Sequence, residues 1–178
     1  MPTYVVFLRA INLGARRKFP KDAVRAATER AGGEGVATWL NTGNVRLDHR
    51  ARSVERVRSA LEAAYAEEAG FEVPTVVFPT ADLAALTARG EELHAEHDPG
   101  GQHYVTLFAT APGAEARAAV EALDHDGETV VVEGRAAYVL LEGDIHTSRL
   151  LASREFKALG EGTARTITVL RTVTGKWC

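Results

Sequence analysis

Two short polar segments of the sequence carry residues that could bind an anion. Residues 4–20 read YVVFLRAINLGARRKFP, in which an apolar stretch ends in Arg9, Asn12 and Gly14 and is followed by Lys18. Residues 40–45 read LNTGNV. Cationic side chains, side-chain amides and the open backbone amides of glycine suit phosphate or carboxylate near the start of a helix. The two segments form one site only if the fold brings them together.

Each segment also has a purely structural interpretation. A basic loop after a strand can be a solvated turn in which Arg9 pairs with a neighbouring carboxylate. The turn at residues 41–44 needs no ligand to explain it, because Gly and Asn tolerate positive φ. The sequence leaves both interpretations open.

The composition is that of a folded protein with unevenly distributed charge. The 178 residues fit one compact domain or two small ones, and the 46% hydrophobic content is enough for a core. Residues 1–21 hold five basic residues and no acidic one, whereas residues 81–148 hold 13 acidic residues against three basic ones. The acidic middle weighs against a protein that wraps nucleic acid over its whole surface.

The sequence shows no signal for export or for a membrane span. Its one cysteine, Cys178, is the last residue, so no internal disulfide is expected and the cytoplasm is the default compartment. No segment approaches the roughly 18 apolar residues that a span needs, and residues 4–8 are too few for a secretory signal. We predict a soluble, unprocessed chain with no membrane partner and no cofactor.

Hydrophobic periodicity predicts the element order of the first half. Residues 4–8 are typical of a strand and residues 23–31 of a helix, which Gly32 and Gly33 end. A hairpin of residues 36–40 and 45–47 follows. Ser53 can cap a second helix, which Gly70 closes before a strand at residues 73–78. The predicted order is βαββαβ.

The second half repeats this pattern. We predict strands at residues 104–109, 129–132 and 137–141, and helices at residues 114–123 and 150–159, the latter capped by Ser148. Residues 166–173 fit either a strand or a short helix. We therefore predict an α+β duplication of two βαββαβ ferredoxin-like units, residues 1–79 and 103–178, joined by a helical connector at residues 80–102.

This topology predicts that the two polar segments meet. In a βαββαβ unit the first two strands are parallel, and the third lies between them and runs the other way. The third strand therefore starts where the first one ends. We expect the loop of residues 12–18 and the turn of residues 41–44 at one edge of the sheet, with Arg9 and Asn44 as near neighbours.

Three motifs resemble those of a bacterial family catalogued as domain of unknown function 1697. They are FLRAINLG with the later Lys18 and Pro20, LNTGNV, and TAR at residues 163–165. The resemblance covers essentially the whole chain and implies an α+β duplication, but it implies no established activity. By this resemblance the candidate ligand-binding residues are Arg9, Asn12, Gly14, Lys18, Gly43, Asn44, Thr163 and Arg165.

The sequence also departs from the family pattern. Ala10 and Ala15 stand where glycines are usual, Thr42 takes the place of a serine, and residues 166–168 read TIT in place of Asn-Trp-Asn. The changes in the first two motifs are small. The third motif lacks the amide and the indole that the family pattern would place there.

A group of histidines lies at the end of the predicted connector and directly after it. His94, His97, Asp98 and His103 are residue types that bind zinc or iron. Their spacing matches no strong metal motif. We interpret them as part of an exposed polar boundary segment, and we predict no metal site.

Three classes of function fit these residues. The prediction is a binding module for a small anionic or phosphorylated ligand, and the alternatives are an enzyme that acts on such a ligand and a single-stranded nucleic-acid binder. The motifs supply no general base for an enzyme. The third strand has no aromatic residue, and Tyr4 and Phe7 point to opposite faces, which disfavours an RNA-recognition surface. The oligomeric state is not predicted.

Overall fold

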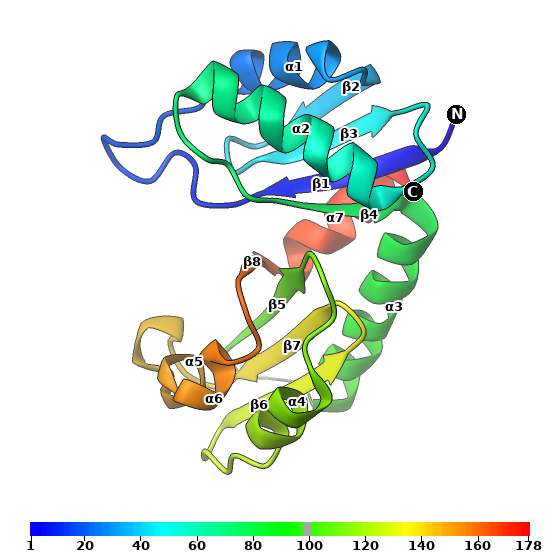
Figure 1. The fold of residues 1–178 in the computed structure, drawn as a ribbon. Coiled ribbons are helices and arrows are strands. Elements are labelled where there is room, and N and C mark those ends of the chain that lie inside the picture. The colour runs from blue at the N-terminus through cyan, green and yellow to red at the C-terminus, as the bar shows by residue number, and fades with distance from the viewer. Residues whose placement is uncertain (98–100) are drawn as a thin grey trace. The chain divides into compact units, whose positions relative to one another are not determined.

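The computed structural model describes residues 1–97 and 101–178. The chain divides into two compact units (Figure 1). Unit 1 consists of Met1–Ala84 with Val173–Cys178, and unit 2 consists of Ala85–Thr172. Asp98, one of the candidate metal ligands, lies outside the described residues.

Unit 1 contains a four-stranded antiparallel sheet with two helices on one face (Figure 1). Its strand order is β2-β3-β1-β4, and β3 pairs antiparallel with both β1 and β2. This is the predicted βαββαβ topology. The elements are β1 (Thr3–Leu8), α1 (Lys21–Arg30), β2 (Glu34–Trp39), β3 (Asn44–Asp48), α2 (Val54–Ala69) and β4 (Thr75–Pro79).

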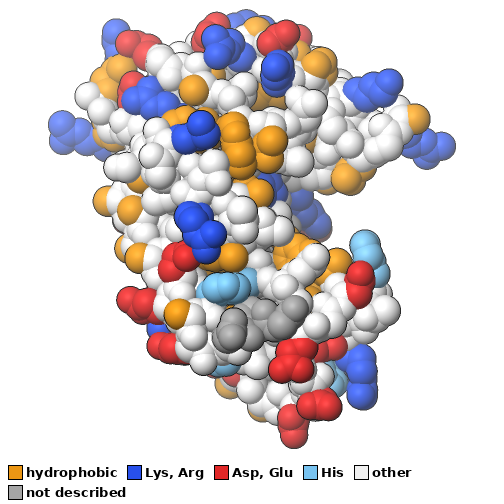
Figure 2. All heavy atoms as spheres, turned by 180° about the vertical axis from the view of Figure 1, so that it is seen from behind, with side chains coloured by type: hydrophobic (Ala, Val, Ile, Leu, Met, Phe, Trp, Pro, Cys, Tyr) orange, Lys and Arg blue, Asp and Glu red, His pale blue; other side chains and the backbone are white. Residues whose placement is uncertain are grey.

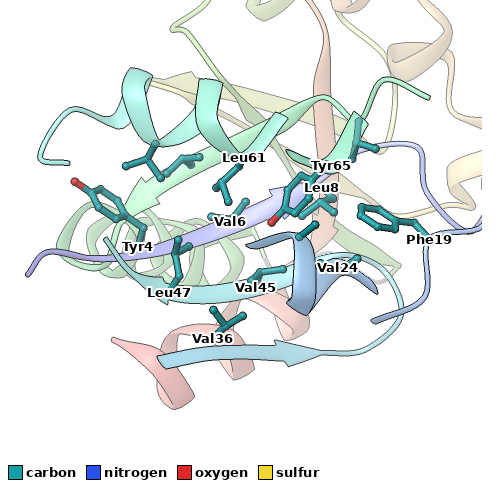
Figure 3. Close-up of a cluster of buried hydrophobic side chains, with 14 of the residues drawn as sticks. Tyr4, Val6, Leu8, Phe19, Val24, Val36, Val45, Leu47, Leu61 and Tyr65 are labelled. Carbon is teal, nitrogen blue, oxygen red and sulfur yellow. The ribbon is translucent and has the colours of Figure 1, made fainter. Parts of the chain in front are cut away.

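The core of unit 1 follows from alternation along β1. Successive residues of a strand point to opposite faces. Tyr4, Val6 and Leu8 are buried among side chains of α1, α2 and the neighbouring strands (Figure 3). Val5 and Phe7 are also fully buried. The first strand is therefore apolar along its whole length because both of its faces are covered.

The ends of α2 are those that the sequence predicts. The Ser53 hydroxyl accepts a hydrogen bond from the backbone N–H of Arg56 at 3.4 Å, which caps α2. Gly70 ends the same helix in the left-handed conformation, with φ of 75°.

Unit 2 repeats the sheet with the order β6-β7-β5-β8. The predicted α+β duplication is thus confirmed. α3 connects β4 to β5 along the chain, and α7 passes from unit 2 into the last residues of unit 1. The elements are α3 (Thr80–His97), β5 (Gln102–Phe108), α4 (Ala114–Glu121), β6 (Glu128–Glu133), β7 (Ala136–Leu141), η1 (Ile145–Thr147), α5 (Arg149–Ala152), α6 (Arg154–Lys157), β8 (Gly162–Thr166) and α7 (Ile167–Trp177).

The predicted helix at residues 150–159 is two short helices instead of one. The Ser148 hydroxyl accepts from Leu151 N–H at 3.1 Å and caps α5. Ser153 then adopts an extended conformation, and its hydroxyl accepts from Phe156 N–H at 3.0 Å, which starts α6. A second N-cap serine thus interrupts the helix, because its side chain offers the backbone an alternative to continued helical bonding.

The ambiguous segment of residues 166–173 is helical from Ile167 onward, and a strand that was not predicted, β8, precedes the helix. β8 ends at Thr166, whose hydroxyl accepts from Val169 N–H at 3.2 Å at the start of α7. The sequence analysis missed β8 because GTART is short and lacks the β-branched and aromatic run that marks most strands. Among helices in the described ranges, none has both the length and the apolar character to span a membrane.

Candidate functional site

The two polar segments meet at one edge of the sheet of unit 1, as predicted. Leu8 N–H donates to the carbonyl of Gly43 at 2.8 Å, and Phe7 is the register partner of Asn44. The side-chain amide of Asn12 donates to the carbonyl of Asn41 at 2.7 Å. The β1–α1 loop and the β2–β3 hairpin are therefore hydrogen-bonded to each other.

Asn12 is the centre of this junction. Its amide nitrogen also donates to the carbonyl of Phe19 at 3.1 Å, and its amide oxygen accepts from Phe19 N–H at 2.8 Å. Its backbone N–H donates to the carbonyl of Arg17 at 2.9 Å. Asn12 has a φ of 55°, a conformation that asparagine tolerates better than most residues. The side chain closes the loop and ties it to the hairpin.

Arg17 is a second structural residue of the loop. Its Nε donates to the carbonyl of Ala10 at 2.8 Å, and its Nη2 donates to the carbonyl of Glu72 at 2.6 Å. Its guanidinium lies 4.7 Å from the centre of the Phe71 ring. The sequence analysis did not single out Arg17, because nothing in the run of residues 16–18 separates one cation from the next.

The hairpin candidates have structural roles as well. Asn44 is fully buried, and its amide nitrogen donates to the carbonyl of Trp39 and to the hydroxyl of Thr42, each at 3.0 Å. Gly43 has a φ of 79°, and a Cβ atom there would lie 2.6 Å from the Cβ of Leu8. Only glycine fits this close approach.

Three further cations, two on the loop and one at the start of α1, face solvent. Arg16 and Lys18 are exposed, as is Lys21 at the start of α1. Within the described part of the chain, no carboxylate lies within 4.0 Å of these three side chains. Arg9 is partly buried, and its backbone N–H donates to the carbonyl of Pro74 at 2.9 Å. Gly14 is exposed with a φ of 64° and open space where a Cβ would lie.

The loop leads into a helix start that no side chain caps. Pro20 is the N-cap of α1, and it offers no side-chain hydrogen bond. The first intrahelical bond runs from Val24 N–H to the carbonyl of Pro20 at 3.0 Å. The N–H groups of the first turn therefore point out of the helix, beside Lys18 and Lys21, with Asp22 as an acidic neighbour.

The hollow that the structure describes between the loop and the hairpin is small. The hollow that Ile11, Phe19 and Asn41 help to line has a volume of about 10 Å³, room for about one water molecule. Any ligand here lies on the surface. On the face drawn in Figure 2, Lys and Arg side chains are more frequent over unit 1, and Asp and Glu side chains over unit 2.

Thr163 and Arg165 lie on β8, in unit 2. The Nη1 of Arg165 donates to the Thr163 hydroxyl and to the carbonyl of Ala164, each at 2.8 Å. Both residues are buried, and burial lowers the pKa of Arg165 to about 10. The eight candidates thus fall into two groups, six in unit 1 and two in unit 2.

The interpretation of His103 as part of an exposed boundary is wrong. His103 is on β5 and only 3% exposed, and its ring lies 5.6 Å from that of His94, centre to centre. The sequence did hold a signal, because His103 falls directly before the apolar alternation of residues 104–109. The described residues include no group of three or more His, Cys, Asp or Glu that could hold a metal ion.

The first strand offers no aromatic platform for stacking bases. The Tyr4 ring is 1% exposed, and its hydroxyl donates to the carbonyl of Ala51 at 2.9 Å. Phe7 is fully buried and makes an edge contact with Phe78, with ring centres 6.4 Å apart. Neither ring is accessible to a nucleic acid.

Comparison with known proteins supports the fold and the family. No curated protein matches the chain. The structure of the conserved bacterial protein SP0830 from Streptococcus pneumoniae is similar, with a TM-score of 0.76 and 17% sequence identity over 99% of this chain and 98% of that one. At that identity the likeness concerns the fold. Residues 1–138 match the family described as "Protein of unknown function (DUF1697)", a range that ends before Thr163 and Arg165. The chain belongs to the DUF1697 family.

Proposed function

We propose that the β1–α1 loop and the first turn of α1 bind a small phosphorylated ligand. The proposal rests on the observation that different side chains of the loop have different roles. Asn12 and Arg17 hold its backbone, while Arg16, Lys18 and Lys21 are exposed and have no carboxylate partner in the described ranges. Cations on a preorganised loop lose little conformational freedom when they bind an anion.

The helix start adds directional hydrogen-bond donors. A phosphate at this position can accept from the first-turn N–H groups and interact with the positive end of the helix dipole. Lys18 and Lys21 then supply charge-assisted hydrogen bonds. Asp22 opposes this attraction, because its carboxylate competes for the same end of the dipole. The site is accordingly one of modest affinity.

The other family positions take supporting roles in this proposal. Gly14 belongs to the ligand-facing group, because it is exposed and leaves its backbone accessible, and the partly buried Arg9 adds positive charge at the start of the loop. Asn12, Gly43 and Asn44 position the loop from within the protein. Binding is favoured over catalysis because these residues supply positive charge and hydrogen-bond donors but no general base.

The test is isothermal titration calorimetry on the full chain with inorganic phosphate, nucleotides and sugar phosphates. We expect Lys18→Ala and Lys21→Ala each to weaken binding roughly 3- to 10-fold, and Asp22→Asn to tighten it roughly 3-fold. Lys157→Ala removes an exposed lysine of α6 and should leave binding unchanged. The affinity should fall as salt is added, since exposed charges are screened.

Two results would count against the proposal. One is the lack of a heat signal with every phosphorylated compound. The other is binding that Lys157→Ala weakens as much as Lys18→Ala does, which would indicate nonspecific attraction to any lysine.

A further inference from the structure

Two histidine rings on separate elements of unit 2 lie against each other. His94 on α3 and His103 on β5 have ring centres 5.6 Å apart and ring planes 12° from parallel. Neither ring nitrogen of His103, nor Nδ1 of His94, has a hydrogen-bond partner among the residues described. Buried polar groups are paired in most proteins. A buried imidazole with both nitrogens unpaired is therefore unusual.

The same stretch of α3 is docked on the sheet of unit 2 by other contacts. The Tyr138 hydroxyl of β7 donates to the carbonyl of Leu86 at 2.9 Å. Gly90 allows close approach, because a Cβ there would lie 3.2 Å from the Tyr138 ring. Leu93 is 2% exposed. These contacts do not ionise in mild acid. Arg89 of α3 also pairs with Glu133 of β6 at 3.2 Å, but both side chains are partly exposed, so this ion pair contributes little to docking. The histidine pair is therefore the buried part of the interface that responds to pH.

The ionisable groups around His103 come from three elements. On α3, His94 and His97 repel a proton on His103, whereas Glu91 attracts one. Arg171 of α7 forms an ion pair with Glu91 at 2.8 Å. Tyr138 of β7 has its ring centre 6.3 Å from that of His103. Burial is the main effect, and with the charge on His94 it lowers the pKa of His103 to about 4.

We propose that the His94–His103 pair is an acid-sensitive latch, which holds the second half of α3 on the sheet of unit 2 at neutral pH and releases it in acid. A proton on buried His103 puts a charge next to a second imidazole, where no described residue accepts a hydrogen bond from it. Release returns the ring to water, where the charge is hydrated.

Release should leave α3 helical. His94 and His97 lie in its last turn, and the ring of His97 is hydrogen-bonded to the carbonyl of Leu93 at 2.9 Å. Protonated histidines near a helix C-terminus interact favourably with its carbonyl groups. Acid therefore weakens the docking of the helix without unfolding it, although an undocked helix opens its backbone hydrogen bonds more often than a packed one.

The direction of the pH effect follows from the two pKa values. A released histidine has a pKa of about 6.5, and in the docked state that of His103 is about 4. The docked state therefore has its full stability above about pH 6.5 and loses it as the pH falls toward 4. At pH 4.5 the docking equilibrium should be roughly 50-fold weaker than at pH 7.

Hydrogen exchange on the full chain tests the latch. Between pH 7 and 4.5, after correction for intrinsic exchange rates, peptides from residues 85–97 should lose protection before those of the unit 1 sheet. His103→Leu removes the titrating ring and should make this protection insensitive to pH. The control is His146→Gln, which replaces an exposed histidine of unit 2 and should behave as the parent chain does.

An NMR titration of the unmodified chain tests the same idea without a substitution. The ring protons of His103 should titrate near pH 4. A pKa near 6.5 for His103, or an unchanged pH response in His103→Leu, would overturn the latch.

Discussion

The two units share a topology but differ in the loops at one edge of the sheet. The first strand and first helix are joined by twelve residues in unit 1, residues 9–20, and by five in unit 2, residues 109–113. The hairpins have four residues, 40–43, in unit 1 and two, 134–135, in unit 2. Unit 2 shows that the fold closes with short connections. The longer loops of unit 1 are therefore additions to the fold, and they are the loops that form the proposed site (Figure 1).

The units also differ in how they treat a polar residue near the start of the first strand. Thr3 lies five residues before the end of β1, and its hydroxyl donates to the Asp48 carboxylate at 2.6 Å. His103 lies five residues before the end of β5 and has no such partner in the described ranges. The hydrogen bond from Thr3 holds the pKa of the Asp48 carboxyl below its usual range. In unit 1 the polar residue at this position has a hydrogen-bond partner. In unit 2 the corresponding residue, His103, has none among the residues described, and we propose that it makes this unit sensitive to acid.

The largest expected effect is a difference in stability between matching glycine variants of the two hairpins. Gly43→Ala places a Cβ 2.6 Å from Leu8 at a φ of 79°, so we expect a loss of roughly 3 kcal/mol in the free energy of unfolding. Gly134→Ala, in the matching hairpin, meets no atom within 4 Å and bears only the cost of its φ of 54°, about 1 kcal/mol. Urea denaturation of both variants measures the difference.

Equal losses of unfolding free energy in the two glycine variants would contradict the difference that we infer between the two hairpins. They would mean that the unit 1 hairpin is no more tightly packed against β1 than its counterpart against β5. A larger loss for Gly134→Ala would reverse it.

A smaller effect is expected at the junction of the two loops. Asn12→Ala removes three side-chain hydrogen bonds and places alanine at a φ of 55°, so we expect a loss of about 2 kcal/mol. Asn41→Ala is the control, because Asn41 contributes its backbone carbonyl to the junction, and we expect less than about 0.5 kcal/mol. Thermal unfolding followed by circular dichroism compares the two. A loss in Asn12→Ala no greater than that control would show that the loop is held elsewhere.

The fold was predictable from sequence where local signals agreed with one another. The apolar run of β1, the Ser53 cap and the Gly70 helix end all pointed to one topology, and that topology placed the loop beside the hairpin. Two errors arose where a short-range signal was weak. In the sequence nothing distinguishes Ser153, which caps a new helix, from a serine inside a helix. β8 is too short and too polar to be predicted as a strand.

Which side chains hold the β1–α1 loop and which face solvent was not predictable. The motifs mark Asn12 and Asn44 as polar, but only coordinates show that their amides are bonded within the protein. Likewise, three successive cations at residues 16–18 have similar chemistry in sequence. Their roles differ because Arg17 alone reaches two backbone carbonyls and an aromatic ring, contacts that depend on where β4 begins.

The smallest expected effect is a difference in stability between variants of the neighbouring cations Arg16 and Arg17. Arg17→Met should cost about 1 kcal/mol of stability, because it removes two hydrogen bonds and the contact with Phe71 at a largely exposed position. Arg16→Met should change stability by less than about 0.5 kcal/mol. Arg17→Lys keeps a cation but cannot reach both carbonyls with one planar group, so it should fall between them.

The same pair should behave in the opposite way toward a ligand. Arg16→Met should weaken phosphate binding a few-fold, because an exposed charge of the proposed site is lost. Arg17→Met should act on binding only through the loop, so a stabilising osmolyte should restore its affinity but not that of Arg16→Met. If both variants lost stability and affinity in the same proportion, the loop would not divide into residues that build it and residues that bind. The long loop of unit 1 would then be a structural addition only.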